Sequence, residues 1–403
     1  MKYIEGGVCA AKGFRASGVH CGIRANRTKR DLALIVSDVR AAAAAVYTTN
    51  KVFGAPIAVT RKNIADGYAQ AVICNSGNAN TCNADGIEIA EGMCALVERY
   101  AGIPASDVVV ASTGVIGQRL SLEPIESGMT ELVAALGDRH ADAVEAIMTT
   151  DTVPKEAAVE FCIGGKTAHI GGMAKGSGMI HPNMATMLIF LTSDVSISPE
   201  MLQKAVSGDV RDSFNMVSID GDTSTNDTFA VLANGLAGNE PITAPGADFD
   251  AFCAALRAVT EKLCAMLARD GEGATRLITC KVTGAKDREN AKIAAKSVIC
   301  SSLVKAMIYG ADANWGRVLC ALGYSGAELD VSKIDVAFAS RKGSITVCEM
   351  GSGIDFSEED AKTILSEDEI EILVTLRDGD ACATAWGCDL TYDYVKINGD
   401  YRT

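Results

Sequence analysis

Strand-length apolar runs and amphipathic helical segments alternate along the whole 403-residue chain. Residues 31–36 form a short apolar run of strand length, whereas the apolar positions of residues 87–100 recur at helical spacing. Residues 108–112 form a further strand-like run, and Ser198 directly before Pro199 is a typical helix start. This alternation predicts an α/β (α+β) protein built from layered sheets and helices.

The length of the chain allows two or three domains. A new strand begins near residues 277–282, and the helix–strand alternation restarts there. We therefore expect a catalytic domain over residues 1–279 and a smaller C-terminal α/β domain over residues 280–403. A long helix is predicted to begin at Asp248 as its cap and to stop at Asp270, which places Glu272 in the loop beyond it.

The composition excludes several classes of function. The formal net charge is −14, which disfavours a nucleic-acid binder, because such proteins need an excess of Lys and Arg. The amino-terminal residues contain no secretory signal, and no apolar run is long enough to cross a bilayer, so we expect a cytoplasmic protein without a membrane partner. The fourteen cysteines are scattered singly without a CxxC pair, which predicts free thiols and no structural zinc.

Residues 175–191 join a glycine-rich loop directly to an apolar run. The segment KGSGMIHPNMAT ends at Thr186, and the following residues 187–191 (MLIFL) predict a buried strand. A threonine hydroxyl becomes a useful nucleophile when Thr is a chain N-terminus, because the free α-amine then acts as its base. Cleavage of the Ala185–Thr186 bond would create that terminus, with a flexible loop before the bond and a rigid strand after it.

Other readings of the segment have weaker support. The loop lacks the Walker spacing of a phosphate site, and no GxGxxG sequence opens a helix after a strand. The chain has no GxSxG sequence, and His181 is followed by a proline within the loop, so a serine hydrolase triad has no anchor. From the residues alone, an ordinary turn that enters an ordinary strand also remains open.

The motifs of the chain, taken together, resemble those of the ornithine acetyltransferase family, the glutamate N-acetyltransferases of the cyclic arginine pathway. Residues 175–186 resemble the self-cleavage motif of that family, which is cut at Ala-Thr. The other matching segments arrive in family order over essentially the full length; they are residues 6–8 (GGV), 12–14 (KGF), 75–80 (NSGNAN), 112–117 (STGVIG), 222–227 (DTSTND), 270–275 (DGEGAT), 314–317 (NWGR), 394–398 (YVKIN) and 401–403 (YRT). Ala313, Cys9 and Ala11 depart from the pattern, and none of them is a residue to which we assign chemistry.

The resemblance implies a role for each matching residue. Thr186 would be the nucleophile of self-cleavage and of acetyl transfer, and Thr113 with Gly114 would stabilise the tetrahedral oxyanion. Substrate would be bound by residues from several distant segments, with the choice between the first two left open: Thr149 or Thr150, Lys175, Thr186, Glu272, Asn398 and Thr403. No role is implied for Asp151 or Asp222, for which capping or turn formation is the default.

The resemblance also implies the overall activity. The chain would be a self-processing acyltransferase of a fold related to the N-terminal-nucleophile aminopeptidases, cut into an α chain 1–185 and a β chain 186–403. It would move an acetyl group from N-acetylornithine to glutamate in a ping-pong reaction, without a metal or organic cofactor, and would assemble as a heterotetramer. Acetyl-CoA is a possible further donor that the sequence does not decide. The alternatives are an aminopeptidase or amidase of similar fold and a non-catalytic binding protein.

Overall fold

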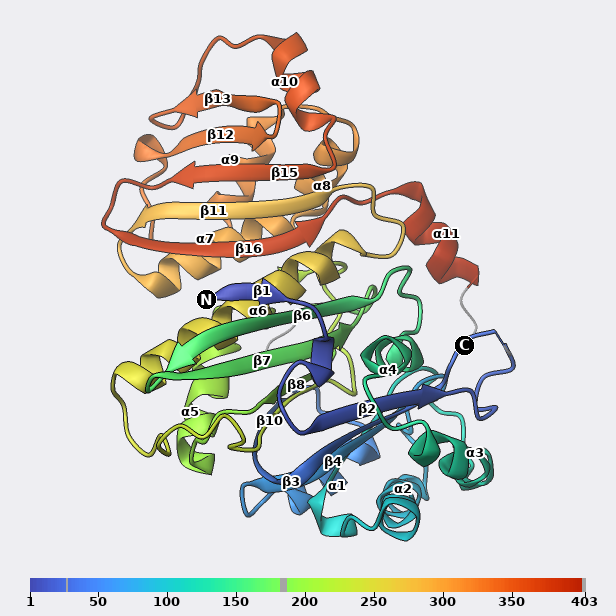
Figure 1. The fold of residues 1–403 in the computed structure, drawn as a ribbon. Coiled ribbons are helices and arrows are strands. Elements are labelled where there is room, and N and C mark those ends of the chain that lie inside the picture. Colours follow the sequence, from blue (N-terminus) through green and yellow to red (C-terminus); the bar gives the residue numbers. More distant parts are fainter. Residues whose placement is uncertain (27, 182–186, 401–403) are drawn as a thin grey trace.

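The computed structural model describes residues 1–26, 28–181 and 187–400, and these residues form two sheets with helices around them (Figure 1). The first sheet has the strand order β1-β6-β7-β8-β10-β3-β4-β5, with β2 paired to β3. Its strands are β1 Lys2–Ile4, β2 Phe14–Val19, β3 Leu32–Tyr47, β4 Tyr68–Asn75, β5 Val108–Ser112, β6 Lys155–Ile163, β7 Lys166–Lys175, β8 Leu188–Ser193 and β10 Thr228–Ala233. The prediction of an α/β (α+β) fold is confirmed.

The second sheet has the order β14-β13-β12-β15-β11-β16-β9. Its strands are β9 Val217–Ser218, β11 Leu277–Ala285, β12 Asp335–Ser340, β13 Gly343–Glu349, β14 Ser352–Gly353, β15 Glu369–Thr375 and β16 Ala381–Cys388. The strand that was expected near residue 277 is therefore present as β11. The division of the chain into domains at residues 279 and 280 remains a prediction, and the short strand β9 comes from before that point.

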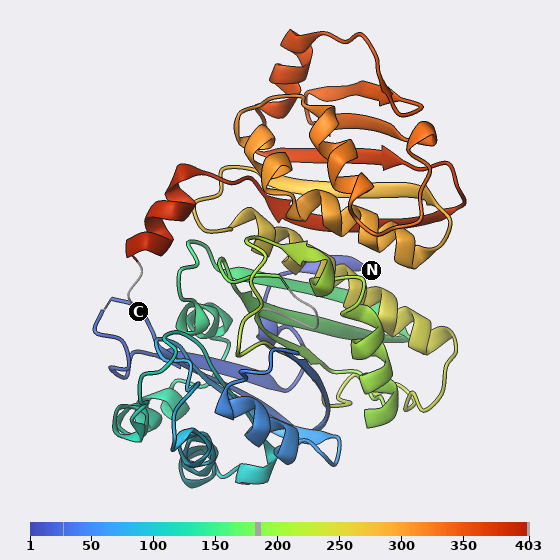
Figure 2. The ribbon, with the colours of Figure 1, turned by 180° about the vertical axis from the view of Figure 1, so that it is seen from behind.

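Helices cover the two sheets and fill the space between them (Figures 1 and 2). Helices α7, α8 and α9 lie on one face of the second sheet, and α5 and α6 lie behind the first (Figure 2). The helices are α1 Ala55–Asn63, α2 Gly86–Ala101, α3 Leu122–Ala134, α4 His140–Ile147, α5 Pro199–Asp209, α6 Ala247–Arg269, α7 Arg288–Cys300, α8 Ser302–Tyr309, α9 Trp315–Gly323, α10 Glu358–Leu365 and α11 Tyr392–Asp400.

Helix ends follow the local sequence signals in one case and depart from them in another. The Ser198 side chain accepts a hydrogen bond from Met201 N–H, so it caps α5 as expected. Helix α6 begins one residue before Asp248, and its cap position is Gly246. The prediction of Asp248 as the cap is wrong, because its carboxylate accepts a hydrogen bond from the Gly164 backbone N–H at the turn between β6 and β7 instead.

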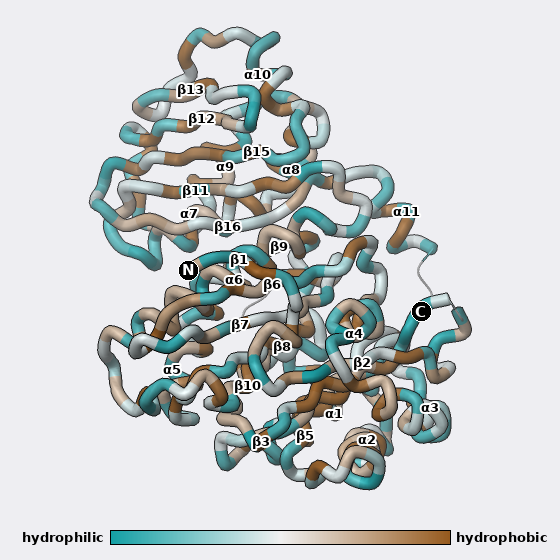
Figure 3. Tube along the Cα trace, viewed as in Figure 1, coloured by the Kyte–Doolittle hydropathy of each residue, from teal (hydrophilic) through white to brown (hydrophobic). Residues whose placement is uncertain are grey.

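The apolar run after the glycine-rich loop lies at the centre of the first sheet. Strand β8 pairs antiparallel with β7 and parallel with β10, and all of its residues are buried. Met187, the residue before β8, accepts a hydrogen bond from Thr228 N–H at the start of β10. The prediction of a buried strand is therefore confirmed. The start of β8 is held by a neighbouring strand on each of its two edges. Hydrophobic residues concentrate in the strands, whereas the outer loops are hydrophilic (Figure 3).

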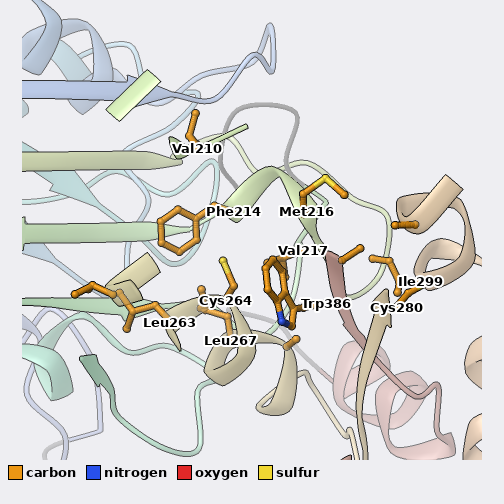
Figure 4. Close-up of a cluster of buried hydrophobic side chains, with 14 of the residues drawn as sticks. Val210, Phe214, Met216, Val217, Leu263, Cys264, Leu267, Cys280, Ile299 and Trp386 are labelled. Carbon is orange, nitrogen blue, oxygen red and sulfur yellow. The ribbon is translucent and has the colours of Figure 1, made fainter. Parts of the chain in front are cut away.

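One continuous apolar cluster joins the two sheets through α6 (Figure 4). Phe214 packs edge-on against Phe229 of β10, with ring centroids 5.1 Å apart. Leu267 of α6 and Trp386 of β16 belong to the same cluster. Since burial of a large apolar side chain contributes about 1.5–3 kcal/mol, this cluster holds the second sheet firmly against the first. It thereby positions α11, which follows β16, beside the end of the first sheet (Figure 1).

Candidate active site

A cavity of about 150 Å³ gathers residues from segments that are far apart in the sequence. Its lining contains every predicted catalytic and substrate residue that the structure describes, which are Thr113, Gly114, Thr149, Thr150, Lys175, Glu272 and Asn398. The cleavage pair Ala185–Thr186 and the terminal residue Thr403 lie outside the described residues. The remaining lining residues are Ala79, Ile116, Gly178, Met179, Ser224, Thr225 and Asn226.

Thr113 and Gly114 follow β5 at its carboxyl end. Thr113 N–H donates to Asn75 O and Val115 N–H donates to Gly77 O, whereas Gly114 N–H has no acceptor among the described residues. The φ angle of Gly114 is +130°, and a Cβ there would lie 2.4 Å from the carbonyl carbon of Gly77. Only glycine fits at this position. The turn therefore presents an unused amide beside a threonine hydroxyl at the cavity wall.

Lys175 ends β7 and is buried, with an exposed fraction of 9%. Its Nζ lies 3.4 Å from Thr113 Oγ1 and donates a hydrogen bond to it. Burial lowers the pKa of Lys175 below its ordinary value, because a charged amine is poorly solvated there; nearby Asp151 opposes this and nearby Lys155 adds to it. Lys175 is therefore more easily deprotonated than a surface lysine, and its charge polarises the Thr113 hydroxyl.

The loop between α4 and β6 supplies Thr149 and Thr150. Thr150 Oγ1 lies 2.7 Å from Ser177 Oγ, which ties this loop to the glycine-rich loop after β7. Thr149 N–H donates to Asp151 Oδ2 at 2.9 Å, but the Thr149 hydroxyl makes no hydrogen bond to any part of the chain that the structure describes. The two threonines therefore differ, since the Thr150 hydroxyl already engages Ser177, whereas the Thr149 hydroxyl keeps its donor and both acceptor sites for a ligand.

Asp151 lies beneath this loop with an exposed fraction of 2%. Its Oδ1 accepts hydrogen bonds from Gly176 N–H at 2.7 Å and from Lys155 Nζ at 2.7 Å. Burial alone would raise the pKa of Asp151, but the positive charges of Lys175 and Lys155 outweigh it and hold the pKa below its ordinary value. Asp151 is therefore an ionised carboxylate shared by two lysines.

Glu272 lies in the loop after α6, as predicted, and α11 reaches it from the other side. Glu272 N–H donates to Ser177 O at 2.8 Å, and Asn398 Nδ2 donates to Glu272 Oε2 at 2.8 Å. Gly178 is close to the same carboxylate, since a Cβ on Gly178 would lie 2.4 Å from Glu272 Cδ. The wall that carries Glu272 is thus built from α6, the glycine-rich loop and the C-terminal helix.

Residues 223–227 form a part of the site to which we assigned no chemistry from the sequence. Asn226 Oδ1 accepts a hydrogen bond from Thr81 Oγ1, and its Nδ2 donates to Ala79 O and Ser112 O. The side chain thereby ties the residues beside Thr113 to the start of β10. A run of hydroxyl and amide residues directly before a buried strand is the signal that could have indicated this role.

Asp227 adds a second buried carboxyl, whose environment is opposite to that of Asp151. Its Oδ2 has no hydrogen-bond partner within residues 1–26, 28–181 and 187–400. Burial raises the pKa of Asp227 well above its ordinary value, and the weaker effects of Ser224, Lys175 and Thr48 do not reverse this. Burial therefore favours the neutral form of the Asp227 carboxyl, although the charge of Lys175 acts against it.

The described residues lack both a metal-binding cluster and a membrane-spanning helix. They contain no group of three or more His, Cys, Asp or Glu side chains arranged to hold a metal ion. They also contain no helix that is both long and apolar enough to pass through a membrane.

Comparison with known proteins gives a consistent result over nearly the full length. Residues 15–403 match the ArgJ family. The "Arginine biosynthesis bifunctional protein ArgJ" of Caldanaerobacter subterraneus subsp. tengcongensis is 49% identical, with 100% of both chains covered, and that of Bacillus subtilis is 46% identical, with 99% of this chain and 97% of that protein covered. A solved structure of ArgJ from Bacillus halodurans is 46% identical with a TM-score of 0.50, and it covers 53% of this chain and 98% of its own.

Proposed function

Because the chain belongs to the ArgJ family, we propose that it transfers the acetyl group of N-acetylornithine to glutamate in arginine biosynthesis. The observation that carries this proposal is the single cavity in which Thr113, Gly114, Lys175, Glu272 and Asn398 meet. The full-length curated relatives favour this transferase over the amidase and the non-catalytic binding protein that the sequence left open.

The nucleophile of the proposed reaction is Thr186, made available by cleavage of the Ala185–Thr186 bond. The chain would then consist of residues 1–185 and 186–403, assembled with a second copy as a heterotetramer. The firm anchoring of Met187 and β8 supports this proposal, since a new terminus beside a central strand stays in place. The solved ArgJ chain of Bacillus halodurans also covers only 53% of this chain, and residues 186–403 are a similar share.

Acetyl transfer proceeds in two steps: Thr186 first takes the acetyl group from N-acetylornithine and then passes it to glutamate. In the first step, Thr186 Oγ attacks the acetyl carbonyl of N-acetylornithine, and the α-amine of Thr186 takes up the hydroxyl proton. The C–N bond then breaks, and ornithine leaves with a proton. In the second, the glutamate amine attacks the acetyl-threonine ester, and the hydroxyl of Thr186 is restored. Neither step needs a metal or an organic cofactor.

Thr113 and Gly114 suit the tetrahedral oxyanion of both steps. The unused N–H of Gly114 is held at the cavity wall by a backbone that only glycine can adopt. The Thr113 hydroxyl accepts a hydrogen bond from Lys175, so its own proton is free to point toward the developing negative charge. A pair of fixed donors of this kind typically lowers the barrier by several kcal/mol, about 2.7–4 for one donor.

The charged walls of the cavity match the two ends of ornithine. Glu272, supported by Asn398, suits the side-chain ammonium, and Lys175 suits the α-carboxylate. Thr403 would complete this wall from the C-terminus. Of the two threonines, we assign the substrate hydrogen bond to Thr149, because the Thr150 hydroxyl is already bonded to Ser177.

Two further properties belong to the same proposal. The relatives are named bifunctional, so we expect the chain also to make N-acetylglutamate from acetyl-CoA. The fourteen cysteines, all free in the structure, suit a reducing cytosol, so we expect a cytoplasmic protein.

Denaturing electrophoresis and a rate assay test the proposal. The purified protein should give two bands of roughly half size, and Thr186→Ala should give one band of full length. N-acetylornithine should release ornithine rapidly only when glutamate is present; equal release without glutamate would identify a hydrolase. Acetyl-CoA with glutamate, and without N-acetylornithine, measures the second activity directly.

A further inference from the structure

Lys155, the first residue of β6, is fully buried behind the active-site cavity. Lysine is almost never fully buried unless it is paired. Its Nζ donates to Asp151 Oδ1 at 2.7 Å, to Asp270 Oδ2 at 2.6 Å and to Val153 O at 3.4 Å. One ammonium group therefore satisfies two carboxylates that are 119 residues apart in the sequence.

The two carboxylates hold the loop of residues 149–153 from two sides. Asp151 accepts the backbone N–H groups of Thr149 and Gly176, and so joins the threonine loop to the glycine-rich loop. Asp270 accepts the N–H of Thr152 at 3.0 Å, together with the Thr152 hydroxyl.

Asp270 is also the C-cap of α6, directly after its last residue Arg269 and two residues before Glu272. The chain from Asp270 to Glu272 is short, so the position of Asp270 limits where the Glu272 carboxylate can lie. Lys155 links Asp270 to Asp151, and this adds a second connection to the direct one that Glu272 N–H makes to Ser177 O in the loop after Lys175.

None of Lys155, Asp151 and Asp270 lines the cavity itself. The three side chains therefore act through Thr149, Lys175 and Glu272 rather than by contact with substrate. A cluster that served stability alone would do as well with apolar side chains of similar volume, because buried ion pairs often add little net stability.

We propose that Lys155 is a positioning residue that sets the spacing between the Glu272 wall and the Lys175 wall of the active site. This inference rests on the proposed function, and it names a further residue on which recognition of the two charged ends of the substrate depends. Loss of the ammonium would leave two buried carboxylates without the positive charge between them. The hydrogen bonds of Asp270 to Thr152 and Val153 would remain, but the repulsion of like charges would push the two walls apart.

The test compares Lys155→Met, which keeps the length of the side chain, with Lys155→Arg, which keeps the charge. Lys281→Met is the matched control, because Lys281 also lies on a strand and pairs with a carboxylate, that of Glu371 in the second sheet. KM and kcat for N-acetylornithine are measured on each variant, with active enzyme counted by the fraction of cleaved chain.

Lys155→Met should raise KM by at least about tenfold, because the charged walls no longer match the substrate, and Lys155→Arg should recover most of this loss. Lys281→Met should stay within about twofold of the unaltered protein. Damage to folding alone would lower the amount of active enzyme and leave KM unchanged, so a folded Lys155→Met variant with an unchanged KM overturns the proposal. If Lys155→Met does not fold, Asp270→Asn replaces it, with the same expectation and the same overturning result.

Hydrogen exchange separates this inference from the proposed function. The amides of Thr149, Thr152 and Gly176 should exchange slowly in the unaltered protein and at least about tenfold faster in Lys155→Met, while amides of β11 and β15 stay unchanged. This readout does not need activity. Unchanged exchange at all three amides would overturn the role of Lys155 even if acetyl transfer is found, and faster exchange would support it even if the substrate is a different one.

Discussion

Asn398 Nδ2 donates a hydrogen bond of 2.8 Å to Glu272 Oε2, and this contact joins the C-terminal helix to the active-site cavity. Helix α11 has no buried residues, and its first residue, Tyr392, packs edge-on against Tyr309 of α8 with ring centroids 5.9 Å apart. The Tyr394 hydroxyl, which donates to Asp220 Oδ2 at 3.4 Å, is the other side-chain contact of the helix with the glycine-rich side of the site. Helix α11 therefore orients the Glu272 carboxylate through the hydrogen bond from Asn398.

Replacement of Asn398 by alanine should raise KM for N-acetylornithine by about tenfold and change kcat less, because Glu272 loses its orientation in the ground state and the transition state alike. Initial rates over a range of substrate concentration measure this. Val395→Ala on the same helix, at a side chain that is 69% exposed, is the control and should have no effect. An equal rise of KM in both variants would show that the helix matters as a whole and that the hydrogen bond does not.

The lowered pKa of Lys175 predicts a loss of activity at high pH. Lysine is charged below its pKa, so if the charged form polarises Thr113, kcat/KM falls as pH rises through a value below the ordinary one. Lys175→Arg stays charged at all accessible pH values and should extend the activity to higher pH, at some loss of rate from altered geometry. Lys175→Met should lower kcat/KM by about 100-fold. An alkaline limb at the same pH in Lys175→Arg would assign it to a different group.

Asp151 and Asp227 should respond oppositely to replacement by asparagine. The pKa of Asp151 is lowered by folding, so its ionised form stabilises the protein above pH 4, and this stabilisation is lost as pH falls. The pKa of Asp227 is raised by folding, so the carboxyl ionises at a higher pH in the folded than in the unfolded protein, and it destabilises the protein as pH rises above about 4. At pH 7, Asp151→Asn should lower the free energy of unfolding and Asp227→Asn should raise it, each by at least about 1 kcal/mol.

Urea unfolding at pH 7 and again at pH 3 measures both effects. Both differences should shrink at pH 3, because ionisation then contributes less to each. A stabilising Asp151→Asn at pH 7 would mean that the two lysines do not outweigh the burial of that carboxylate.

Much of the fold could be predicted from the sequence because the signals are local. The apolar period of α2, the Ser198 cap of α5 and the buried run of β8 each depend on neighbouring residues, and each is present in the structure. Glu272 was expected in a loop because the helical pattern before it ends at Asp270. The cap of α6 was predicted wrongly, since a tertiary contact with Gly164 engages the side chain of Asp248.

The structure adds what depends on contacts between distant segments. Lys155 and Asp151 are four residues apart, yet they do not lie on one helix, and only the arrival of Asp270 from α6 explains why a lysine is buried there. Capping or turn formation was the default expectation for Asp151; in the structure its carboxylate accepts the Thr149 N–H, and its ion pairs could not be predicted. The motifs that contain Lys175 and Glu272 indicated a site because they resemble those of a family. The structure shows that both residues line the same cavity.

Gly114→Ala should abolish acetyl transfer. The added Cβ would lie 2.4 Å from Gly77 C and 2.6 Å from Asn78 N, and these backbone atoms cannot move without disturbing the turn that presents the Gly114 amide. We expect kcat to fall by at least about 100-fold, as for loss of an oxyanion donor, with little change in KM. Steady-state rates measure this, and Gly208→Ala in α5, where a Cβ meets nothing within 4 Å, is the control. A Gly114→Ala variant with normal kcat would remove this amide from the mechanism.

Gly178→Ala should have a different effect, because its added Cβ meets a side chain rather than backbone. The nearest atoms are the Glu272 carboxylate, with Cδ and Oε2 both 2.4 Å away, and this flexible end can turn aside. The protein should therefore fold normally, with a melting temperature within about 2 °C of the unaltered protein. The displaced carboxylate should no longer match a substrate ammonium, so KM for N-acetylornithine should rise by about tenfold while kcat changes less. A large fall in kcat with an unchanged KM would place Glu272 in the chemical steps instead of in substrate recognition.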